Sequence, residues 1–213
     1  MEIVKRGILI VISGFSGAGK GTIMKELLKE YPTQYALSIS ATTRSPRPGE
    51  ENGREYFFKT KDEFLSMIHL GDLIEHAQYV DNYYGTPRKY VEEKLSLGKD
   101  VILEIEIQGA LEIKKKFPDT LLLFISPPSA NALKERLTCR GTEDYETIKK
   151  RLLRASEEAL GIENYDYFVV NDALEQCVEE VHSIIQNEKA RVSRNINFIN
   201  AIRKELHCFS EGE

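Results

Sequence analysis

Short apolar runs recur along the chain, and stretches with helical spacing separate them. The runs are Ile8–Ile12, the interior of Asp100–Glu106, and Leu121–Ile125. Apolar runs of this length without alternation are typical of strands buried on both faces of a parallel sheet. Apolar residues recur at helical spacing after the first run, in Ile23–Leu28. The pattern therefore predicts an α/β fold built on a parallel sheet.

The pattern changes between the first and second runs. Tyr35–Ser40 alternates like a strand, whereas Ala41–Arg54 contains two prolines and two glycines, which argues against a regular element there. Thr60–Glu63 is a capping box that opens a helix closed by Gly71. Short strands with a single helix between two helical crossovers predict a small mobile lobe. The other elements expected here are strands at Tyr56–Phe58 and Leu73–Tyr79, a turn at Asn82–Pro87, and a helix at Lys89–Leu97.

The second half of the chain predicts a pair of arginine-rich helices, a last strand and a long terminal helix. Ser129 is placed to cap the first helix of the pair and Thr142 the second. A solvated charged face is the default for such helices, and a lid over a nucleotide is the alternative. The remaining elements are a helix at Gly109–Phe117, the strand Tyr167–Val170, and a cap at Asn171–Asp172 for the final helix. The apolar stripe of that final helix continues loosely to Ile202, which predicts that the helix packs against the protein or forms a homo-oligomer.

The most specific signal is the glycine-rich segment Gly14–Thr22, between the first strand and the first helix. Glycines let backbone N–H groups form a nest for an anion, and the helix adds the positive end of its dipole. Lys20 supplies a mobile charge for the outer phosphates. The common GxxxxGK[ST] pattern has a hydroxyl directly after the lysine, but here Gly21 takes that position and Thr22 follows. The segment predicts a phosphate-binding loop (P-loop) and a three-layer core of the P-loop NTPase type.

Two further groups of charged residues could serve a phosphate ligand. Arg44 and Arg47 lie three apart in a proline-stiffened turn, where their planar donors can hold one phosphate; the alternative is a solvated basic loop. Glu104 and Glu106 end a predicted parallel strand, so they should face the P-loop side. There they could hold the waters of a metal ion, accept hydrogen bonds from a base, or order neighbouring arginines.

Composition limits the partners. The 213 residues carry 29 basic and 34 acidic side chains and a formal charge of −5, which argues against a general nucleic-acid binder and favours a small anion. No apolar run approaches the roughly 20 residues of a membrane span. The three cysteines lack a CxxC pair and the four histidines lack ligand spacing. Together with the absence of a signal peptide, these features predict a cytoplasmic protein with no membrane partner.

Taken together, these segments resemble the guanylate kinase family of P-loop nucleoside monophosphate kinases over nearly the whole chain. Beyond the P-loop, Ser38–Glu50 with Gly53 and Tyr56 is similar to the family's GMP-binding signature. Further family landmarks appear in order at Asn82–Thr86, Glu104–Gly109, Pro127–Ser129, Arg140–Glu143 and Asn171–Asp172. The resemblance implies transfer of the γ-phosphoryl group of ATP to GMP, giving ADP and GDP, with Mg²⁺ as cofactor.

The resemblance also implies a role for each matching residue. The catalytic residues would be Lys20, Arg44, Arg136, Arg140 and Arg151. ATP would be bound by Gly14, Phe15, Ser16, Gly17, Ala18, Gly19, Lys20, Gly21, Thr22 and Asn171. GMP would be bound by Ser40, Arg44, Arg47, Tyr56, Glu75, Tyr84, Thr86 and Glu104, with Glu75 and Thr86 reading guanine. Magnesium would contact Thr22 and, through water, Glu106, which stands where the family often has aspartate.

The expected organisation is one guanylate-kinase domain over residues 1–213. Its core comprises residues 1–37, 88–126 and 158–213, its GMP-binding lobe residues 38–87, and its lid residues 127–157. Two other functions fit the same segments. One is a guanylate-kinase-like module that binds a protein partner, and the other is a kinase for a different phosphorylated acceptor. The protein-binding module is disfavoured because the chain has Lys20, Arg44, Arg47 and Glu75. The kinase for a different acceptor is disfavoured because the chain has Glu75 and Thr86.

Overall fold

The core of the protein is a five-stranded parallel sheet. The computed structural model describes residues 5–79, 81–139 and 144–211. Each neighbouring pair in the order β2-β7-β1-β8-β9 is parallel, which confirms the predicted fold class. The strands are β1 (Leu9–Gly14), β2 (Tyr35–Leu37), β7 (Asp100–Glu104), β8 (Leu121–Ser126) and β9 (Tyr167–Val170).

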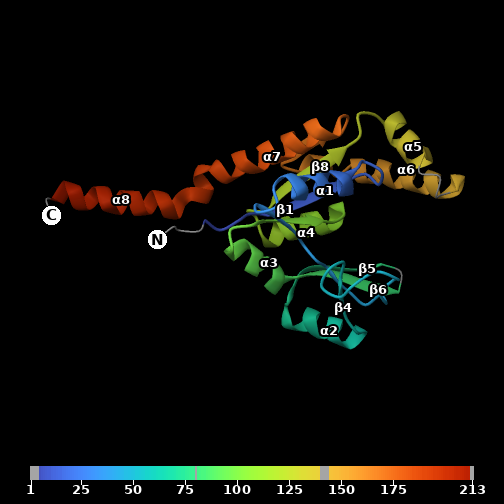
Figure 1. Ribbon diagram of the computed structural model, residues 1–213, viewed down its shortest axis with the longest axis horizontal. Coiled ribbons are helices and arrows are strands. Elements are labelled where there is room, and N and C mark those ends of the chain that lie inside the picture. Colours follow the sequence, from blue (N-terminus) through green and yellow to red (C-terminus); the bar gives the residue numbers. More distant parts are fainter. Residues whose placement is uncertain (1–4, 80, 140–143, 212–213) are drawn as a thin grey trace.

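Helices cover both faces of this sheet, so the core has three layers (Figure 1). Successive side chains of a strand point to opposite faces. Ile10 and Ile12 therefore pack in one cluster with α1 (Lys20–Glu30) and α7 (Leu174–Ala190), while Val11 packs in the other with α3 (Arg88–Ser96) and α4 (Ile107–Lys116). Burying each such side chain stabilises the fold by about 1.5–3 kcal/mol. The apolar runs found in the sequence are thus explained by burial on two sides.

A second, four-stranded sheet forms the inserted lobe and has the order β4-β3-β6-β5. Its helix α2 (Lys61–Leu70) has the predicted capping box: Thr60 Oγ1 accepts from Glu63 N at 3.2 Å, and the Glu63 carboxylate accepts from Thr60 N at 2.7 Å. Phe64 of this helix is fully buried on the sheet. The strands are β3 (Ala41–Thr42), β4 (Phe57–Phe58), β5 (Leu73–Tyr79) and β6 (Asn82–Pro87).

Two local predictions in this lobe are wrong, and so is one at the strand that precedes it. Asn82–Pro87 is strand β6 and not a turn, and β3 forms at Ala41–Thr42, where no regular element was expected. The preceding strand, β2 of the main sheet, ends at Leu37 and does not continue to Ser40. The two lobe strands form because distant segments pair, since Thr42 lies opposite Tyr84 in an antiparallel ladder. Local composition carries no information about such a partner.

The arginine-rich pair is α5 (Ala130–Cys139) and α6 (Tyr145–Ala159), beside the carboxyl end of the main sheet (Figure 1). Ser129 Oγ accepts from Ala132 N at 3.1 Å, as predicted for a cap of α5. Asp144 caps α6 by accepting from Thr147 N at 2.7 Å, so the predicted cap at Thr142 is wrong. Thr142 itself lies outside the described residues. The two helices share a small apolar cluster with Phe15 of the P-loop, made of Leu133, Leu137, Ile148, Leu152 and Ala155.

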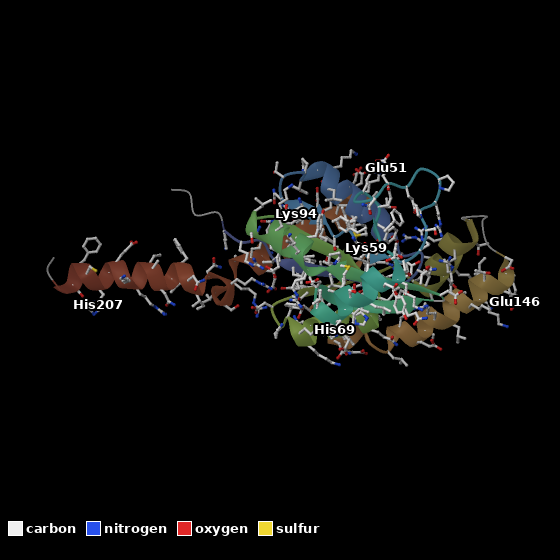
Figure 2. All side chains as sticks on the ribbon, turned by 90° about the horizontal axis from the view of Figure 1, so that it is seen from below. Glu51, Lys59, His69, Lys94, Glu146 and His207 are labelled. Atoms are coloured by element: carbon white, nitrogen blue, oxygen red, sulfur yellow. The ribbon has the colours of Figure 1, made fainter. Side chains whose placement is uncertain are left out.

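The C-terminal region is two helices and not one. The 3-10 helix η1 (Ile162–Asn164) precedes β9. A second 3-10 helix, η2 (Val192–Asn195), separates α7 from α8 (Ile196–Glu211) and interrupts the apolar stripe that was predicted to be continuous. No side chain of the described residues caps α7, so the predicted cap at Asn171–Asp172 is also wrong. In Figures 1 and 2, α8 projects away from the body, and its Phe209 is 77% exposed. No helix in the described ranges has the length and apolar character needed to cross a membrane.

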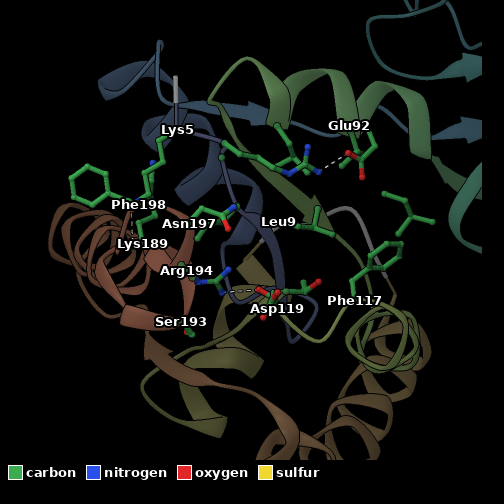
Figure 3. A pocket seen from close by; sticks show the side chains of 17 residues that line it. Lys5, Leu9, Glu92, Phe117, Asp119, Lys189, Ser193, Arg194, Asn197 and Phe198 are labelled. Carbon is green, nitrogen blue, oxygen red and sulfur yellow. Dashed lines mark hydrogen bonds and ion pairs between the residues drawn. The ribbon is translucent and has the colours of Figure 1, made fainter. Parts of the chain in front are cut away.

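A cavity of about 620 Å³ lies at the amino ends of β1 and β8, away from the P-loop (Figure 3). Its cations already have partners: Arg6 pairs with Glu92, Lys189 pairs with Asp100, and Arg194 donates to the Asp119 carbonyl oxygen at 2.6 Å. These contacts join the segment before β1 to α3, α7 to β7, and η2 to the segment before β8. Because Asn197 and Phe198 also line the cavity, it lies where the start of α8 meets the core.

Asp100, the partner of Lys189, is fully buried, so its removal should destabilise the protein. Its carboxylate is fully buried and accepts from Ile8 N at 3.0 Å and from Lys189 Nζ at 2.8 Å. We expect Asp100→Ala to lower the free energy of unfolding by about 3 kcal/mol, because a buried donor and a cation lose their acceptor. Chemical denaturation measures this change. Lys115→Ala, which breaks an exposed pair with Glu112, should cost less than about 1 kcal/mol, and equal losses in the two variants would contradict the expectation.

Candidate active site

The P-loop leaves β1 and enters α1 through positions that require glycine. A Cβ atom on Gly14 would lie 2.2 Å from the Ile125 carbonyl oxygen, and one on Gly19 would lie 2.4 Å from Asn171 Nδ2. Gly19 has a left-handed φ of 94° and is the N-cap of α1, with no side-chain cap from the described residues. Uncapped N–H groups at a helix start attract an anion. Gly21 and Thr22 lie in the first turn and are exposed.

Lys20 and Arg151 both reach back to this loop. The Lys20 ammonium donates to the carbonyl oxygens of Gly14 at 2.8 Å and Phe15 at 3.3 Å. From the lid helix α6, Arg151 donates to Ser16 Oγ. Two cations from different elements therefore meet at the loop, as a ligand with several phosphate charges requires.

A central cleft of about 670 Å³ connects the P-loop, the end of β7 and α6. Its charged lining is Lys20, Glu104, Glu106, Lys150, Arg151, Arg154 and Glu158. Glu106 pairs across the cleft with Arg154, which also bonds Glu158 at 3.2 Å. Burial raises the pKa of Glu158, and the hydrogen bond from Arg154 opposes this. Lys150 and Arg154 were not predicted as site residues; the one signal was that Arg154 follows Arg151 by three residues, which puts both on one face of α6.

The Arg44 loop faces the same cleft from the second sheet. The Arg44 guanidinium carbon lies 5.4 Å from the centre of the Tyr56 ring, and the Tyr56 and Tyr84 rings are 6.2 Å apart. Tyr56 lines the central cleft and also a pocket of about 160 Å³. That small pocket also contains Ser40, Thr86 and Glu104. The structure thus brings together most of the predicted acceptor residues, while the Arg47 side chain is exposed and lines neither pocket.

Glu50 holds this loop and was not predicted as a site residue. Its carboxylate accepts from Arg44 Nη2 at 2.9 and 3.0 Å and from Arg47 N at 2.7 Å. The hydrogen bond from Arg44, and after it the one from Arg47 N–H, lowers the pKa of Glu50. The same Arg44–Glu50 hydrogen bond raises the pKa of Arg44. The one sequence signal for this contact was the spacing of an acid three residues after Arg47.

Glu75 is a mostly buried carboxylate beside the small pocket. Thr86 Oγ1 donates to Glu75 Oε1 at 2.7 Å, and Thr86 is only 1% exposed. Burial raises the pKa of Glu75, and the Thr86 hydrogen bond partly opposes that rise. Since a carboxylate has about four acceptor sites, Glu75 can accept more hydrogen bonds from a ligand.

A separate hollow of about 460 Å³ lies on the other side of the P-loop, and we call it the outer hollow. Asn171, whose Nδ2 donates to the Ala18 carbonyl oxygen at 2.7 Å, lines it together with Gly17, Gly19 and Thr22. Arg136 also lines the outer hollow and donates to the Asn171 carbonyl oxygen at 2.8 Å. Arg136 therefore does not join Lys20 and Arg151 in the central cleft. Arg140 lies outside the described residues.

The two predicted metal contacts do not share a hollow. Thr22 lines the outer hollow, whereas Glu106 lines the central cleft. Within the described ranges, no group of three or more His, Cys, Asp or Glu side chains is placed to hold a metal ion. The carboxylates of Glu104 and Glu106 near Lys20 suit a hard cation whose remaining ligands are water and phosphate oxygens.

Comparison with known proteins identifies the family. A profile of the guanylate kinase family matches residues 6–188. A guanylate kinase from Caldanaerobacter subterraneus subsp. tengcongensis is 50% identical over 205 residues, covering 96% of this chain and 99% of that protein. One from Oceanobacillus iheyensis is 50% identical over 192 residues, covering 90% and 93% respectively. The fold is similar to the crystal structure of guanylate kinase from Anaplasma phagocytophilum, with a TM-score of 0.69 and 31% sequence identity. The superposition covers 89% of this chain and 90% of that chain. The predicted resemblance and fold are confirmed, and the chain belongs to the guanylate kinase family of nucleotide-binding kinases.

Proposed function

We propose that the protein transfers the γ-phosphoryl group of ATP to GMP, giving ADP and GDP. The observation that carries the proposal is that two sites for anions adjoin one cleft. The P-loop with Lys20 lines the central cleft, and the small pocket beside the Arg44 loop shares Tyr56 and Glu104 with it. Two phosphorylated ligands could therefore place their phosphates against each other.

The P-loop side is the proposed donor site. Backbone N–H groups of Gly14–Thr22 and the Lys20 ammonium would hold the ATP phosphates. Asn171 and Arg136 line the outer hollow, where they would border the ATP base. Arg151, which already bonds Ser16, would neutralise charge on the transferred group, together with Arg140.

The second sheet provides the proposed acceptor site. Arg44, Arg47, Ser40, Tyr56 and Tyr84 would hold the GMP phosphate. Glu75 and Thr86 would read the base, because a carboxylate can accept from guanine N1–H and the exocyclic amine together. Adenine has no such pair of donors at this edge, so it would leave the buried Glu75 unpaired, which costs binding energy.

Mg²⁺ is the proposed cofactor, and the donor set fits it. The ion would bind phosphate oxygens and water, with Glu106 contacting one of the waters and Glu104 beside it. When bound, it would neutralise phosphate charge during transfer. We assign no metal contact to Thr22 at this site, because Thr22 lines the outer hollow.

Positioning and charge stabilisation would account for the catalysis. In-line phosphoryl transfer needs little covalent chemistry from the protein. No general base is required, because a GMP phosphate oxygen is already anionic at neutral pH. We propose that residues 38–87 and 127–157 move as lobe and lid against the core, and that closing both excludes water and suppresses ATP hydrolysis. The cytoplasmic location and the homo-oligomer remain predictions from the sequence.

A panel of acceptors tests this function. ADP release from ATP should be measured by a coupled assay with GMP, AMP, dTMP, CMP and UMP. We expect turnover with GMP to exceed turnover with every other acceptor. Faster turnover with another nucleotide would reject the assignment of the base, and no turnover with any acceptor would favour a module that binds a protein partner.

The raised pKa of Glu75 predicts a pH dependence. Protonation turns one Glu75 oxygen into a donor, so the side chain can no longer accept from guanine N1–H and the exocyclic amine together. The KM for GMP should therefore rise as pH falls, with an onset above the ordinary glutamate pKa of 4.5. The folded protein also holds this proton more tightly than the unfolded chain, so raising the pH through this range costs the unliganded protein stability. Steady-state KM values measured from neutral to acid pH provide the test. An identical acid limb in Glu75→Gln would contradict the assignment.

A further inference from the structure

Glu50 and Arg44 form a compact ion pair within the acceptor loop. Each side chain is only 17% exposed, and the two carboxylate oxygens lie 2.9 and 3.0 Å from Arg44 Nη2. The same carboxylate accepts from Arg47 N at 2.7 Å. One acid therefore fixes both the side chain of the first arginine and the backbone of the second.

Aromatic rings and a backbone oxygen restrain the same guanidinium. Its carbon lies 5.4 Å from the Tyr56 ring centre and 5.9 Å from that of Phe58. Nη1 donates to the Ser45 carbonyl oxygen at 2.8 Å. A guanidinium has five N–H donors, and these contacts use at most three of them. Glu50 can thus hold Arg44 while other donors remain for a ligand.

We propose that Glu50 is a positioning residue for the acceptor phosphate. It fixes Arg44 and the turn at Arg47 before the ligand arrives, so the loop does not have to become ordered on binding. The inference rests on the proposed function of this site as the acceptor site. Glu50 acts through Arg44 and does not itself touch the phosphate. Loss of Glu50 should therefore weaken the binding of ligands that carry a phosphate and leave the binding of ligands without a phosphate unchanged.

Glu50→Gln tests the proposal, because it keeps the size of the side chain and removes its charge. We expect the KM for GMP to rise about tenfold, because the ordered arginine is lost. We expect the KM for ATP to change less than about twofold, since the proposed ATP site is built from the P-loop and not from this loop. Glu50→Asp keeps the charge and should recover part of the loss. Glu51→Gln, at an exposed neighbouring position labelled in Figure 2, should leave the KM for GMP unchanged.

Guanosine separates a positioning role from a structural one. It carries the base without the phosphate, so its inhibition constant against GMP should be the same in Glu50→Gln and in the wild type. Equal weakening of guanosine and GMP would show general damage to the lobe and overturn the proposal. So would an unchanged or lower KM for GMP in the variant. These outcomes are distinct from failure of the proposed function, in which the wild type itself would not phosphorylate GMP.

Discussion

Lys20→Ala should lower kcat about 10³-fold, the scale expected when one charge-stabilising group is lost from a preorganised site. The Lys20 ammonium lies in the central cleft, within 2.8 Å of the Gly14 carbonyl oxygen at the start of the P-loop. It is therefore placed to follow the phosphoryl group during transfer. The acceptor residues come from a different sheet. The KM for GMP should consequently change less than about threefold.

Two measurements make this expectation specific. Lys25→Ala, at an exposed position of the same helix α1, removes an equal charge away from the cleft and should leave kcat unchanged. Calorimetric titration of Lys20→Ala with GMP should still show binding. If this variant no longer binds GMP, the division between a donor side and an acceptor side is wrong.

Glu75→Gln should lower kcat/KM for GMP by at least about 100-fold. Two charge-assisted hydrogen bonds to guanine would be lost, and the glutamine amide would bring a donor to face the donors of the base. The Thr86 hydroxyl, which now donates to Glu75 at 2.7 Å, would also lose its charged acceptor. The preference for GMP over AMP should fall along with the rate.

The acceptor panel applied to the variant checks this second result. Glu93→Gln, on the exposed side of α3, is a matched control that should behave as the wild type. An unchanged ratio of GMP to AMP turnover in Glu75→Gln would mean that Glu75 does not read the base. Glu75 would then be a buried carboxyl whose partner is Thr86 alone.

The features that sequence analysis predicted well depend on local chemistry. The apolar runs became buried parallel strands because burial on two faces leaves no polar positions. The capping box at Thr60 formed because its partners are three residues apart. The P-loop was evident because a phosphate-binding turn before a helix needs glycine at fixed places, as the close approach of Asn171 to Gly19 shows.

The features that sequence analysis missed depend on distant partners. Strand β6 forms because Tyr84 and Gly85 pair with β3, some forty residues away. Asn171 was expected to cap a helix, but its side chain donates to Ala18. Arg154 became a cleft residue because the fold brings Glu106 opposite it. In each case a contact between segments overrides what the local sequence favours.

A crystal structure of the protein with GMP bound tests the central claim most directly. The claim predicts the GMP phosphate within hydrogen-bond distance of Arg44 and Arg47, and the base edge against Glu75 and Thr86. The phosphate should point into the central cleft towards Lys20. A structure with the GMP phosphate in the P-loop, or with the base away from Glu75, would contradict the account.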